Sequence, residues 1–378
     1  MSLPDPSFRI DPTPIVDIMD GFRRSKAMFA AVEMGIFDML APDRLNKAPL
    51  TAAEIAERLN ASLTGTERLL EACVALKLLE LHDGKFSSTE VADFYLRRSS
   101  DSGLTGYILY SNLVLYQCWA HLEDSVREGT PRWAQTFGTD KPIFEHFFRT
   151  PEKMRTFTMG MHGLGLTTSP AVVSAFDLSG FHTLADLGAA TGHLVIAACE
   201  TWQNLQGIAF DLAKVLPLAE EHIAASAAHN RIATCPGDFF SGELPPADLY
   251  ALGRILHDWG EDKIRLLLRR IFEALPPGGA LLIAEKLLYE DRSGPLNAHL
   301  QSLNMLVITE GKERSLSEYT ALLRAAGFST IEGKHTGTYL DAIFARKDPA
   351  RKDPARKDRA RKDRARKDRA RKEPARKN

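Results

Sequence analysis

The sequence predicts an α/β fold with a doubly wound sheet, preceded by a smaller domain made of helices. Two observations carry this prediction. After residue 180, short apolar runs of strand length alternate with helical patterns, which is the order of a parallel sheet covered by helices. Before residue 103, apolar residues recur at three- and four-residue spacing, and a short hairpin pattern follows them. We therefore divide the chain into residues 1–103, residues 104–345 and a charged tail over residues 346–378.

The first domain is predicted to contain three helices and a hairpin, the pattern of a winged helix. One helix is expected over residues 14–41, and Thr51 followed by Glu54 forms a capping box that starts the next. Another is expected over about residues 63–81, before a tight turn at residues 82–86. Residues 14–41 carry too many large apolar side chains for one amphipathic face, so we expect a homodimer built on this domain.

The second domain is predicted to begin with a helical linker, residues 104 to about 180, and to continue as the α/β core from about residue 181. In the core, helical patterns cover residues 193–201 and about 214–227, and such connections form right-handed crossovers between parallel strands. Strands are expected at residues 183–187, 207–211, 231–235, 247–252, 280–285 and 339–345.

The tail differs from the rest of the chain in composition. From Arg346 to Asn378 a five-residue repeat of Ala-Arg-Lys-Asp followed by Pro or Arg carries 17 basic and 6 acidic side chains. The first 345 residues carry 31 basic and 43 acidic side chains. The tail holds no large apolar residue, so we expect it to be disordered or a solvated helix. A tail that binds polyanions or a membrane surface is the functional alternative to a repeat without a role.

Composition excludes several classes of protein. Hydrophobic residues make up 44% and charged residues 26% of the chain, as in ordinary globular proteins. No apolar run reaches the ~18 residues of a membrane span, and the acidic body argues against nucleic acid as a partner. The first residues lack the pattern of a secretory signal, and the four cysteines lie far apart, so we expect a cytoplasmic protein without disulfides.

A glycine-bearing turn follows the first strand of the core, in the segment Asp186-Leu187-Gly188-Ala189-Ala190-Thr191-Gly192. Glycine lets the backbone bend sharply and approach a ligand, and the helix that follows favours an anionic group. Asp211 ends the next strand, where a carboxylate typically binds ribose hydroxyls. Both NAD and S-adenosylmethionine would use such a residue. The glycine spacing does not fit the dinucleotide fingerprint, which counts against a nicotinamide oxidoreductase.

Two further strand ends carry residues suited to ligand binding or proton transfer. Gly237-Asp238-Phe239-Phe240 follows the third strand, where a carboxylate and an aromatic ring could hold adenine. His257, in Gly253-Arg254-Ile255-Leu256-His257-Asp258-Trp259, follows the fourth, and a histidine there can take a proton near neutral pH. Glu285 ends the fifth strand and Glu313 lies in a later loop. A carboxylate against one imidazole nitrogen would fix the tautomer and stabilise the cation formed on proton uptake.

Together with Pro277-Gly278-Gly279, Ser302-Leu303-Asn304-Met305-Leu306 and Glu310-Gly311-Lys312-Glu313-Arg314, these motifs identify a resemblance over residues 10–346. The chain resembles the S-adenosylmethionine-dependent O-methyltransferases of the plant caffeate and animal acetylserotonin type. The resemblance implies a Rossmann-like methyltransferase domain behind a winged-helix dimerisation domain. It also implies metal-independent methyl transfer from S-adenosylmethionine to a phenolic or hydroxyindole oxygen of a small aromatic substrate.

The resemblance assigns roles by position. His257 matches the base of the family, with Glu285 and Glu313 as the carboxylates that flank it. The positions that contact the cofactor are Asp186, Gly188, Asp211, Gly237, Asp238, Phe239 and Arg254. The positions on the substrate side are Asp258, Asn304 and Ile308.

The sequence departs from the family at several of its positions. Ala189 and Ala190 replace glycines of the loop, and Ile308 stands where acetylserotonin-type enzymes have a glutamine that helps to hold the substrate. Phe148 and Gly165 stand where those enzymes have a tyrosine and a tryptophan near the cofactor. These changes leave open another hydroxylated aromatic or polyketide natural product as the acceptor. From a different class, a winged-helix regulator or an inactive dimeric scaffold remains an alternative. The helix over residues 63–81 is not net basic, and His257, Glu285 and Glu313 are intact.

Overall fold

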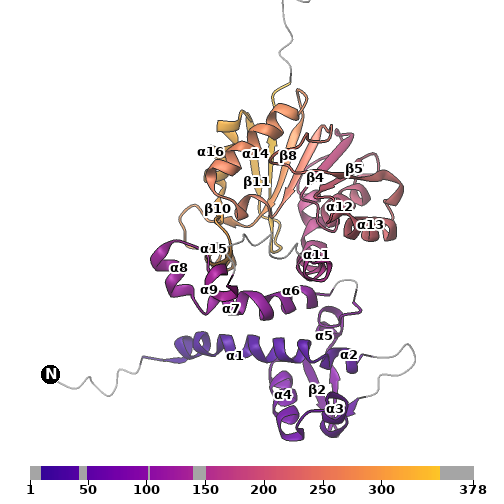
Figure 1. Cartoon of the computed structure of the whole chain (residues 1–378), viewed down its shortest axis with the longest axis vertical. Coiled ribbons are helices and arrows are strands. Elements are labelled where there is room, and N and C mark those ends of the chain that lie inside the picture. The colour runs from indigo at the N-terminus through magenta and orange to yellow at the C-terminus, as the bar shows by residue number, and fades with distance from the viewer. Residues whose placement is uncertain (1–9, 42–48, 101–102, 139–149, 350–378) are drawn as a thin grey trace, which may run out of the picture.

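The computed structural model describes residues 10–41, 49–100, 103–138 and 150–349, which form a small helical lobe and a larger α/β lobe (Figure 1). A layer of helices from the middle of the chain lies between the two lobes (Figure 1). The α/β architecture with a helical N-terminal domain is therefore confirmed.

The N-terminal lobe combines helices with a three-stranded sheet. Its elements are α1 (Thr13–Glu33), α2 (Ile36–Met39), β1 (Leu50–Thr51), α3 (Ala52–Leu59), α4 (Leu63–Ala75), β2 (Leu79–His82), β3 (Lys85–Ser88) and α5 (Glu90–Tyr95). The capping box is confirmed, because the Thr51 hydroxyl accepts from the Glu54 amide at 3.3 Å and the Glu54 carboxylate accepts from the Thr51 amide at 2.7 Å. Asp83 and Gly84 join β2 to β3 at φ 50° and 72°, as a two-residue hairpin turn of the favoured twist requires.

Two of the predicted helices are shorter than the apolar spacing suggests. The segment over residues 14–41 is two helices, because Gly35 adopts φ 76° and ends the first of them. The helix expected over residues 63–81 stops at Ala75. Lys77 has φ 59°, and Leu79–His82 then pair with β3 rather than continuing the helix. Pairing with a neighbouring strand overrides a local helical pattern here.

The second lobe is built on a seven-stranded sheet in the order β11-β12-β8-β7-β4-β5-β6. Its strands are β4 (Thr183–Leu187), β5 (Gln206–Asp211), β6 (Ile232–Pro236), β7 (Leu249–Gly253), β8 (Ala280–Glu285), β11 (Thr330–Lys334) and β12 (Asp341–Arg346). Its longer helices are α12 (His193–Thr201), α13 (Leu216–Ala225), α14 (Glu261–Ala274), α15 (Leu296–Ile308) and α16 (Leu316–Ala326). Two-residue strands β9 (Leu287–Leu288) and β10 (Arg314–Ser315) pair outside the sheet.

The strand order places a switch point in the middle of the sheet. The chain runs from β4 outward through β5 to β6, then returns to the other side of β4 with β7 and β8. These five strands are parallel, whereas β12 is antiparallel to β8. Ligands of open α/β sheets bind outside the carboxyl ends of the strands at such a reversal. The edge strand β11 was not anticipated from the sequence.

The linking helices form the layer between the lobes. They are α6 (Thr105–Tyr110), a π-helical turn (Ser111–Leu115), α7 (Tyr116–Trp119), α8 (Leu122–Glu128), α9 (Trp133–Phe137) and α11 (Pro151–Ser174). Tyr110, Cys118 and Trp133 of this layer pack with Met305 and Ile308 of α15. The layer therefore holds α15 against the sheet lobe. Phe148 lies outside the described residues.

The end of the fold lies beyond the boundary that the sequence suggested. Arg346 is the last residue of β12, and the Lys347 ammonium donates to the carbonyl oxygens of Phe272 and Leu275, each at 2.7 Å. These carbonyls lie at the end of α14, where a cation is favourable. Residues 346–348 thus belong to the α/β lobe rather than to the tail. The tail from residue 350 onward lies outside the described residues.

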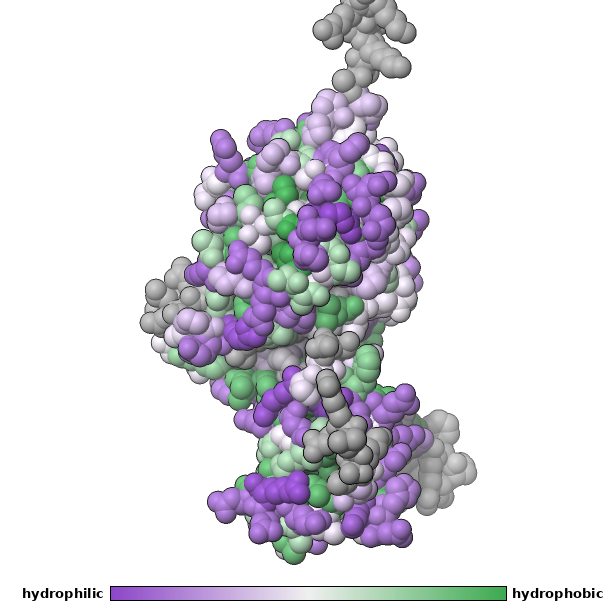
Figure 2. Space-filling view, turned by 90° about the vertical axis from the view of Figure 1, so that its right-hand side faces the viewer, coloured by the Kyte–Doolittle hydropathy of each residue, from purple (hydrophilic) through white to green (hydrophobic). Residues whose placement is uncertain are grey.

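Helix α1 exposes a row of large apolar side chains. Ile15, Ile18, Met19 and Phe22 are 71%, 78%, 55% and 54% exposed. Contiguous apolar surface of this kind marks an interaction face. Figure 2 shows, from another side, polar side chains over most of both lobes and hydrophobic ones near the narrow part between them. Within the described ranges, no helix is both long enough and apolar enough to cross a membrane.

Candidate active site

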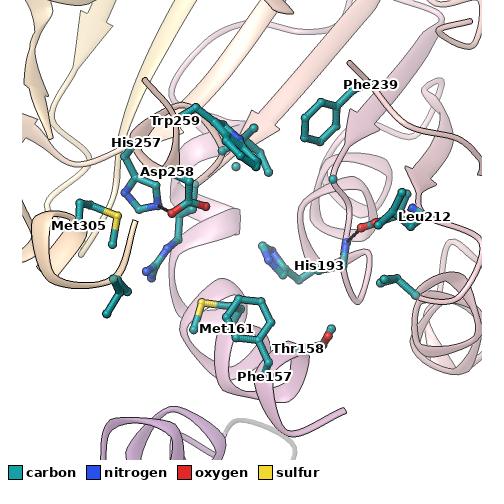
Figure 3. Close-up of a pocket in the computed structure, with 18 of the residues that line it drawn as sticks. Phe157, Thr158, Met161, His193, Leu212, Phe239, His257, Asp258, Trp259 and Met305 are labelled. Carbon is teal, nitrogen blue, oxygen red and sulfur yellow. Dashed lines mark hydrogen bonds and ion pairs between the residues drawn. The ribbon is translucent and has the colours of Figure 1, made fainter. Parts of the chain in front are cut away.

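A cavity of about 320 Å³ lies at the carboxyl ends of the parallel strands, between the sheet and the helices α6, α11 and α15. Of the residues singled out from the sequence, those that line it are Gly188, Asp211, Gly237, Asp238, Phe239, Arg254, His257, Asp258, Asn304 and Ile308. Figure 3 shows side chains from both sides of the cavity converging on it.

The glycine-bearing turn after β4 needs backbone angles and space that most side chains do not allow. Gly188 has φ 79°, and a Cβ added there would lie 2.6 Å from the Ile255 side chain. Ala190 takes φ 52° without being glycine, a left-handed conformation that costs about 1–2 kcal/mol. The Ala190 amide donates to the Asp211 carboxylate at 2.8 Å, and this bond holds the turn in place. The alanine that replaces a family glycine therefore fits the same turn.

The carboxylates of β4 and β5 take different places. Asp211 lines the cavity, and its second oxygen accepts from the Leu212 amide at 2.7 Å. Burial raises the pKa of Asp211 to about 6. Asp186 is 2% exposed beneath the turn and does not line the cavity. Burial, and next the Asp211 charge, raise the pKa of Asp186 to about 7. The direct cofactor contact expected for Asp186 is therefore corrected to a place behind the turn.

The loop after β6 is equally constrained. A Cβ on Gly237 would lie 2.3 Å from the Phe210 ring, so only glycine fits without a shift. The Asp238 carboxylate accepts from the Phe240 amide at 2.8 Å and from the Ser241 hydroxyl at 3.0 Å. The Phe239 ring lies beside the cavity (Figure 3). Asp238 and Phe239 thus present a carboxylate and an aromatic ring to the same part of the cavity.

Arg254 brings hydrogen-bond donors to the cavity. These donors are unpaired within the described part of the chain. It follows β7 with φ 55°, and its buried Nε and Nη1 atoms have no hydrogen-bond partner among the described residues. Buried polar atoms are nearly always paired, so these donors fit a bound group that supplies acceptors. Together with Asp211 and Asp238, they meet the needs of a cofactor with an adenosine and an amino-acid part.

His257 lies against three carboxylates. Its Nδ1 atom is 2.6 Å from Oε1 of Glu313 and 3.4 Å from Oε2 of Glu285, and its Nε2 atom is 3.7 Å from Oδ1 of Asp258. Glu285 is itself fixed, because its Oε1 accepts from the amides of Leu256 and His257 at 2.9 and 3.3 Å. Glu285 and Glu313 are 0% and 1% exposed and lie behind the imidazole rather than on the cavity surface.

The electrostatics of His257 follow from this arrangement. Burial acts to lower its pKa, but the carboxylates of Glu285, Glu313 and Asp258 outweigh burial and raise the pKa to about 9. Burial raises the pKa of Asp258, which the neighbouring imidazole opposes. Burial likewise raises the pKa of Glu285 to about 7. The cluster can therefore take up a proton at Nε2 and stabilise the resulting cation.

The same cluster has the composition of a metal site. Within the described ranges, His257, Glu285 and Glu313 are the group whose ligand atoms come together, within 4.8 Å of one another. Nδ1 of His257 is already bonded to Oε1 of Glu313, and Oε1 of Glu285 accepts from two amides. The Oε2 atoms of both carboxylates have no hydrogen-bond partner among the described residues. A metal bound through Nδ1 would displace the bond from His257 to Glu313, so that bond and metal binding are alternatives.

Most of the remaining lining residues lie on helices α6, α11, α12 and α15, and sequence reasoning did not assign them to the site. The lining residues that were missed include Tyr107, Tyr110, Phe157, Thr158, Met161, His193, Trp259, Gln301 and Met305. Their signal was the three- and four-residue spacing of Tyr107 with Tyr110 and of Phe157 with Met161. That spacing is equally typical of side chains that pack in a hydrophobic core.

His193 replaces a side chain that the family resemblance led us to expect. A Cβ on Gly165 would lie 2.5 Å from the His193 ring, so this ring fills the space beside Gly165. The Nδ1 atom of His193 is bonded to the Ser169 hydroxyl at 2.8 Å. Burial lowers the pKa of His193 to about 4, so the ring is neutral.

Comparison with known proteins agrees with this fold. The sequence pattern of the O-methyltransferase domain matches residues 119–329, and that of the O-methyltransferase dimerisation domain matches residues 16–98. The chain belongs to this family and is an S-adenosylmethionine-dependent O-methyltransferase. The dimerisation domain implies a homodimer.

An animal enzyme and two solved structures are among the similar proteins. Acetylserotonin O-methyltransferase of Gallus gallus is 42% identical over 341 residues, which cover 89% of this chain and 97% of the relative. The crystal structure of human N-acetylserotonin methyltransferase in complex with SAM superposes with a TM-score of 0.84 at 38% identity and covers 91% of this chain and 99% of that one. A solved structure of PigF with SAH matches with a TM-score of 0.80 at 29% identity, covering 89% and 100% of the two chains.

Proposed function

We propose that this enzyme methylates a phenolic or hydroxyindole hydroxyl of a small aromatic molecule without a metal, with His257 as the general base. The observation that carries the proposal is the 2.6 Å contact from Nδ1 of His257 to Glu313, which leaves Nε2 on the cavity side. Transfer to another hydroxylated aromatic or polyketide natural product is the alternative acceptor class. Resemblance to acetylserotonin enzymes supports the hydroxyindole.

The cofactor is proposed to lie along the carboxyl ends of β4, β5 and β6. Gly188 and Gly237 give the backbone room, Asp211 and Asp238 accept hydrogen bonds, Phe239 offers a ring face, and Arg254 donates. When bound, S-adenosylmethionine supplies a methyl group on a positively charged sulfur. Asp186 is proposed to act through the turn that it supports.

His257 is proposed to take the acceptor proton at Nε2 as the acceptor oxygen gains its methyl group. A phenol has a pKa near 10, so an imidazole with a pKa of about 9 is closely matched to it. The Glu313 and Glu285 charges stabilise the imidazolium that forms. Asp258 and Asn304 are proposed to orient the acceptor, with Ile308 as apolar wall.

We also propose that the exposed apolar face of α1 forms the homodimer contact, since it belongs to the segment that matches the dimerisation domain. A cytoplasmic location remains a prediction from the cysteine pattern.

The proposal is tested by incubating the full chain with methyl-labelled S-adenosylmethionine and a panel of phenols, hydroxyindoles and catechols. We expect label in at least one methyl ether, with rates unchanged by a strong chelator. Loss of activity with chelator, restored by a divalent cation, would assign the His257 cluster to a metal. Label in no acceptor would contradict the proposal.

A further inference from the structure

One face of α15 carries the polar groups of the acceptor side. Gln301, Asn304 and Ile308 line the cavity at the spacing of neighbours on one helical face. Gln301 is 5% exposed, and its Nε2 atom has no hydrogen-bond partner among the described residues. The amide of Gln301 was not singled out from the sequence, and the roles proposed above do not use it.

The neighbouring amide is oriented by the chain itself. The indole N–H of Trp119 donates to Oδ1 of Asn304 at 2.9 Å. An indole N–H can only donate, so this bond fixes which end of the Asn304 amide is oxygen. The amide nitrogen of Asn304 is then the atom left for a ligand. Gln301 and Asn304 therefore both offer N–H donors, one helical turn apart.

A buried donor without a partner destabilises a protein, and native chains rarely keep one unless something pairs with it. The rest of this wall cannot pair with Nε2 of Gln301, because Met305 and Ile308 offer no strong hydrogen-bond acceptor in their side chains. A molecule bound in the cavity can supply the group that satisfies this donor.

We propose that Gln301 is a specificity-determining residue whose amide N–H binds an oxygen of the acceptor other than the reacting one. The acceptor is then a hydroxylated aromatic that carries a carbonyl or similar hydrogen-bond-accepting oxygen. This inference rests on the proposed function, because it presumes that the cavity holds the methyl acceptor.

The fold also places this second oxygen. Met305 is drawn on the side of the cavity where His257 lies (Figure 3). Gln301 precedes Met305 by four residues on α15, which is about 6 Å along the helix axis. An acceptor whose hydroxyl reaches His257 thus directs its second oxygen toward the N-terminal half of α15, about one helical turn away.

The test uses two acceptors that differ in one group: para-butylphenol and its keto analogue, in which one chain methylene is a carbonyl. The carbonyl is separated from the ring by saturated carbon, which keeps the phenol pKa equal in the two compounds. Wild type should favour the keto compound in kcat/KM by about tenfold, mainly through KM. Gln301→Leu should abolish this preference. Gln301→Glu, which replaces the donor by an acceptor, should reverse it.

Gln203→Leu is the matched control, since it makes the same change at an exposed glutamine outside the cavity. An unchanged preference in Gln301→Leu, or an equal loss in Gln203→Leu, would overturn the inference. If wild type methylates neither compound, affinities of the two for the S-adenosylhomocysteine complex are measured by calorimetry. A keto preference that depends on Gln301 would then support the inference while the proposed function fails, and equal affinities would overturn it.

Discussion

The wall proposed to hold the cofactor and the wall proposed to hold the base use carboxylates in opposite ways. On the cofactor wall (Gly188, Asp211, Gly237 and Asp238), carboxylate oxygens accept hydrogen bonds from backbone amides. On the base wall (His257 and Asp258, with Glu285 and Glu313 behind), the carboxylates surround an imidazole that can carry positive charge. The same residue type thus fixes backbone on one wall and stabilises a proton on the other.

The difference shows that the partner of a carboxylate decides its effect. Neutral amides hold Asp211 in position, but they cannot cancel the cost of its burial, and its pKa stays raised to about 6. The charged imidazole instead gains from its carboxylates, and the pKa of His257 rises to about 9 despite burial. Changes on one wall should therefore affect cofactor affinity, and changes on the other should affect proton transfer.

The largest effect is expected from removing the base. His257→Ala should lower kcat by at least ~100-fold, because general base catalysis is lost. Its affinity for S-adenosylhomocysteine should stay near that of wild type, since the cofactor wall is untouched. Asp211→Asn should do the reverse: it places an amide NH2 where a backbone N–H now donates, and cofactor affinity should fall by about tenfold.

Calorimetric binding of S-adenosylhomocysteine beside methyl-transfer rates measures both variants. Wild-type rates in His257→Ala would remove the base assignment. Lost cofactor binding in that variant would show that His257 is structural and that the two walls are not separate.

An intermediate effect is expected from the carboxylates behind the imidazole. Glu313→Gln and Glu285→Gln should each lower kcat by about tenfold, less than His257→Ala. An amide oxygen can still accept from Nδ1 but cannot balance the imidazolium charge. Asp238→Asn makes the same exchange on the cofactor wall and is the control. It should change cofactor affinity and leave the dependence of kcat on pH as in wild type. Equal rate losses in all three variants would contradict the distinction.

The smallest effect is expected in the pH dependence of the two walls, because proton transfer and cofactor affinity should change at different pH values. Because the pKa of His257 is raised, the imidazole keeps its proton below pH 9, and kcat/KM for the cofactor should rise with pH up to about 9. With the positively charged cofactor bound, the corresponding midpoint in kcat should lie lower. Cofactor affinity should fall on acidification through about pH 6, where Asp211 takes up a proton. A profile of kcat/KM for the cofactor that is flat above neutral pH would count against His257 as the base.

The sequence predicted the parts of the site that lie at strand ends. Strand β4 and helix α12 have the predicted bounds, since apolar runs and a glycine turn are local signals. His257, Glu285 and Glu313 were singled out from their loops, and the structure brings them together. The approach of His257 to Glu285 follows from the pairing of the parallel strands β7 and β8, whereas Glu313 comes from the segment before β10, outside the main sheet.

The rest depends on packing that no local pattern records. The bond from Trp119 to Asn304 joins residues 185 positions apart, and its partners meet because the linking helices pack on α15. The end of α4 depends on pairing of Leu79–His82 with β3. Asp186 is buried behind its turn, whereas Asp211 lines the cavity. Gln301 lies on α15 among other polar residues, and no local pattern distinguishes it from them.

The single antiparallel strand next to β8 determines from which side of the molecule the chain departs. Asp341 pairs with Glu285, beside the base wall, and Arg346 pairs with Ala280 at the opposite edge of the sheet. Five residue steps of about 3.3 Å separate these pairs. Pro349 follows this strand, so the described part of the chain ends on the side of the sheet away from the carboxyl ends of the parallel strands. A fluorophore or a sensor surface attached directly after Pro349, in a chain shortened at that residue, should therefore leave the cavity side open to substrate.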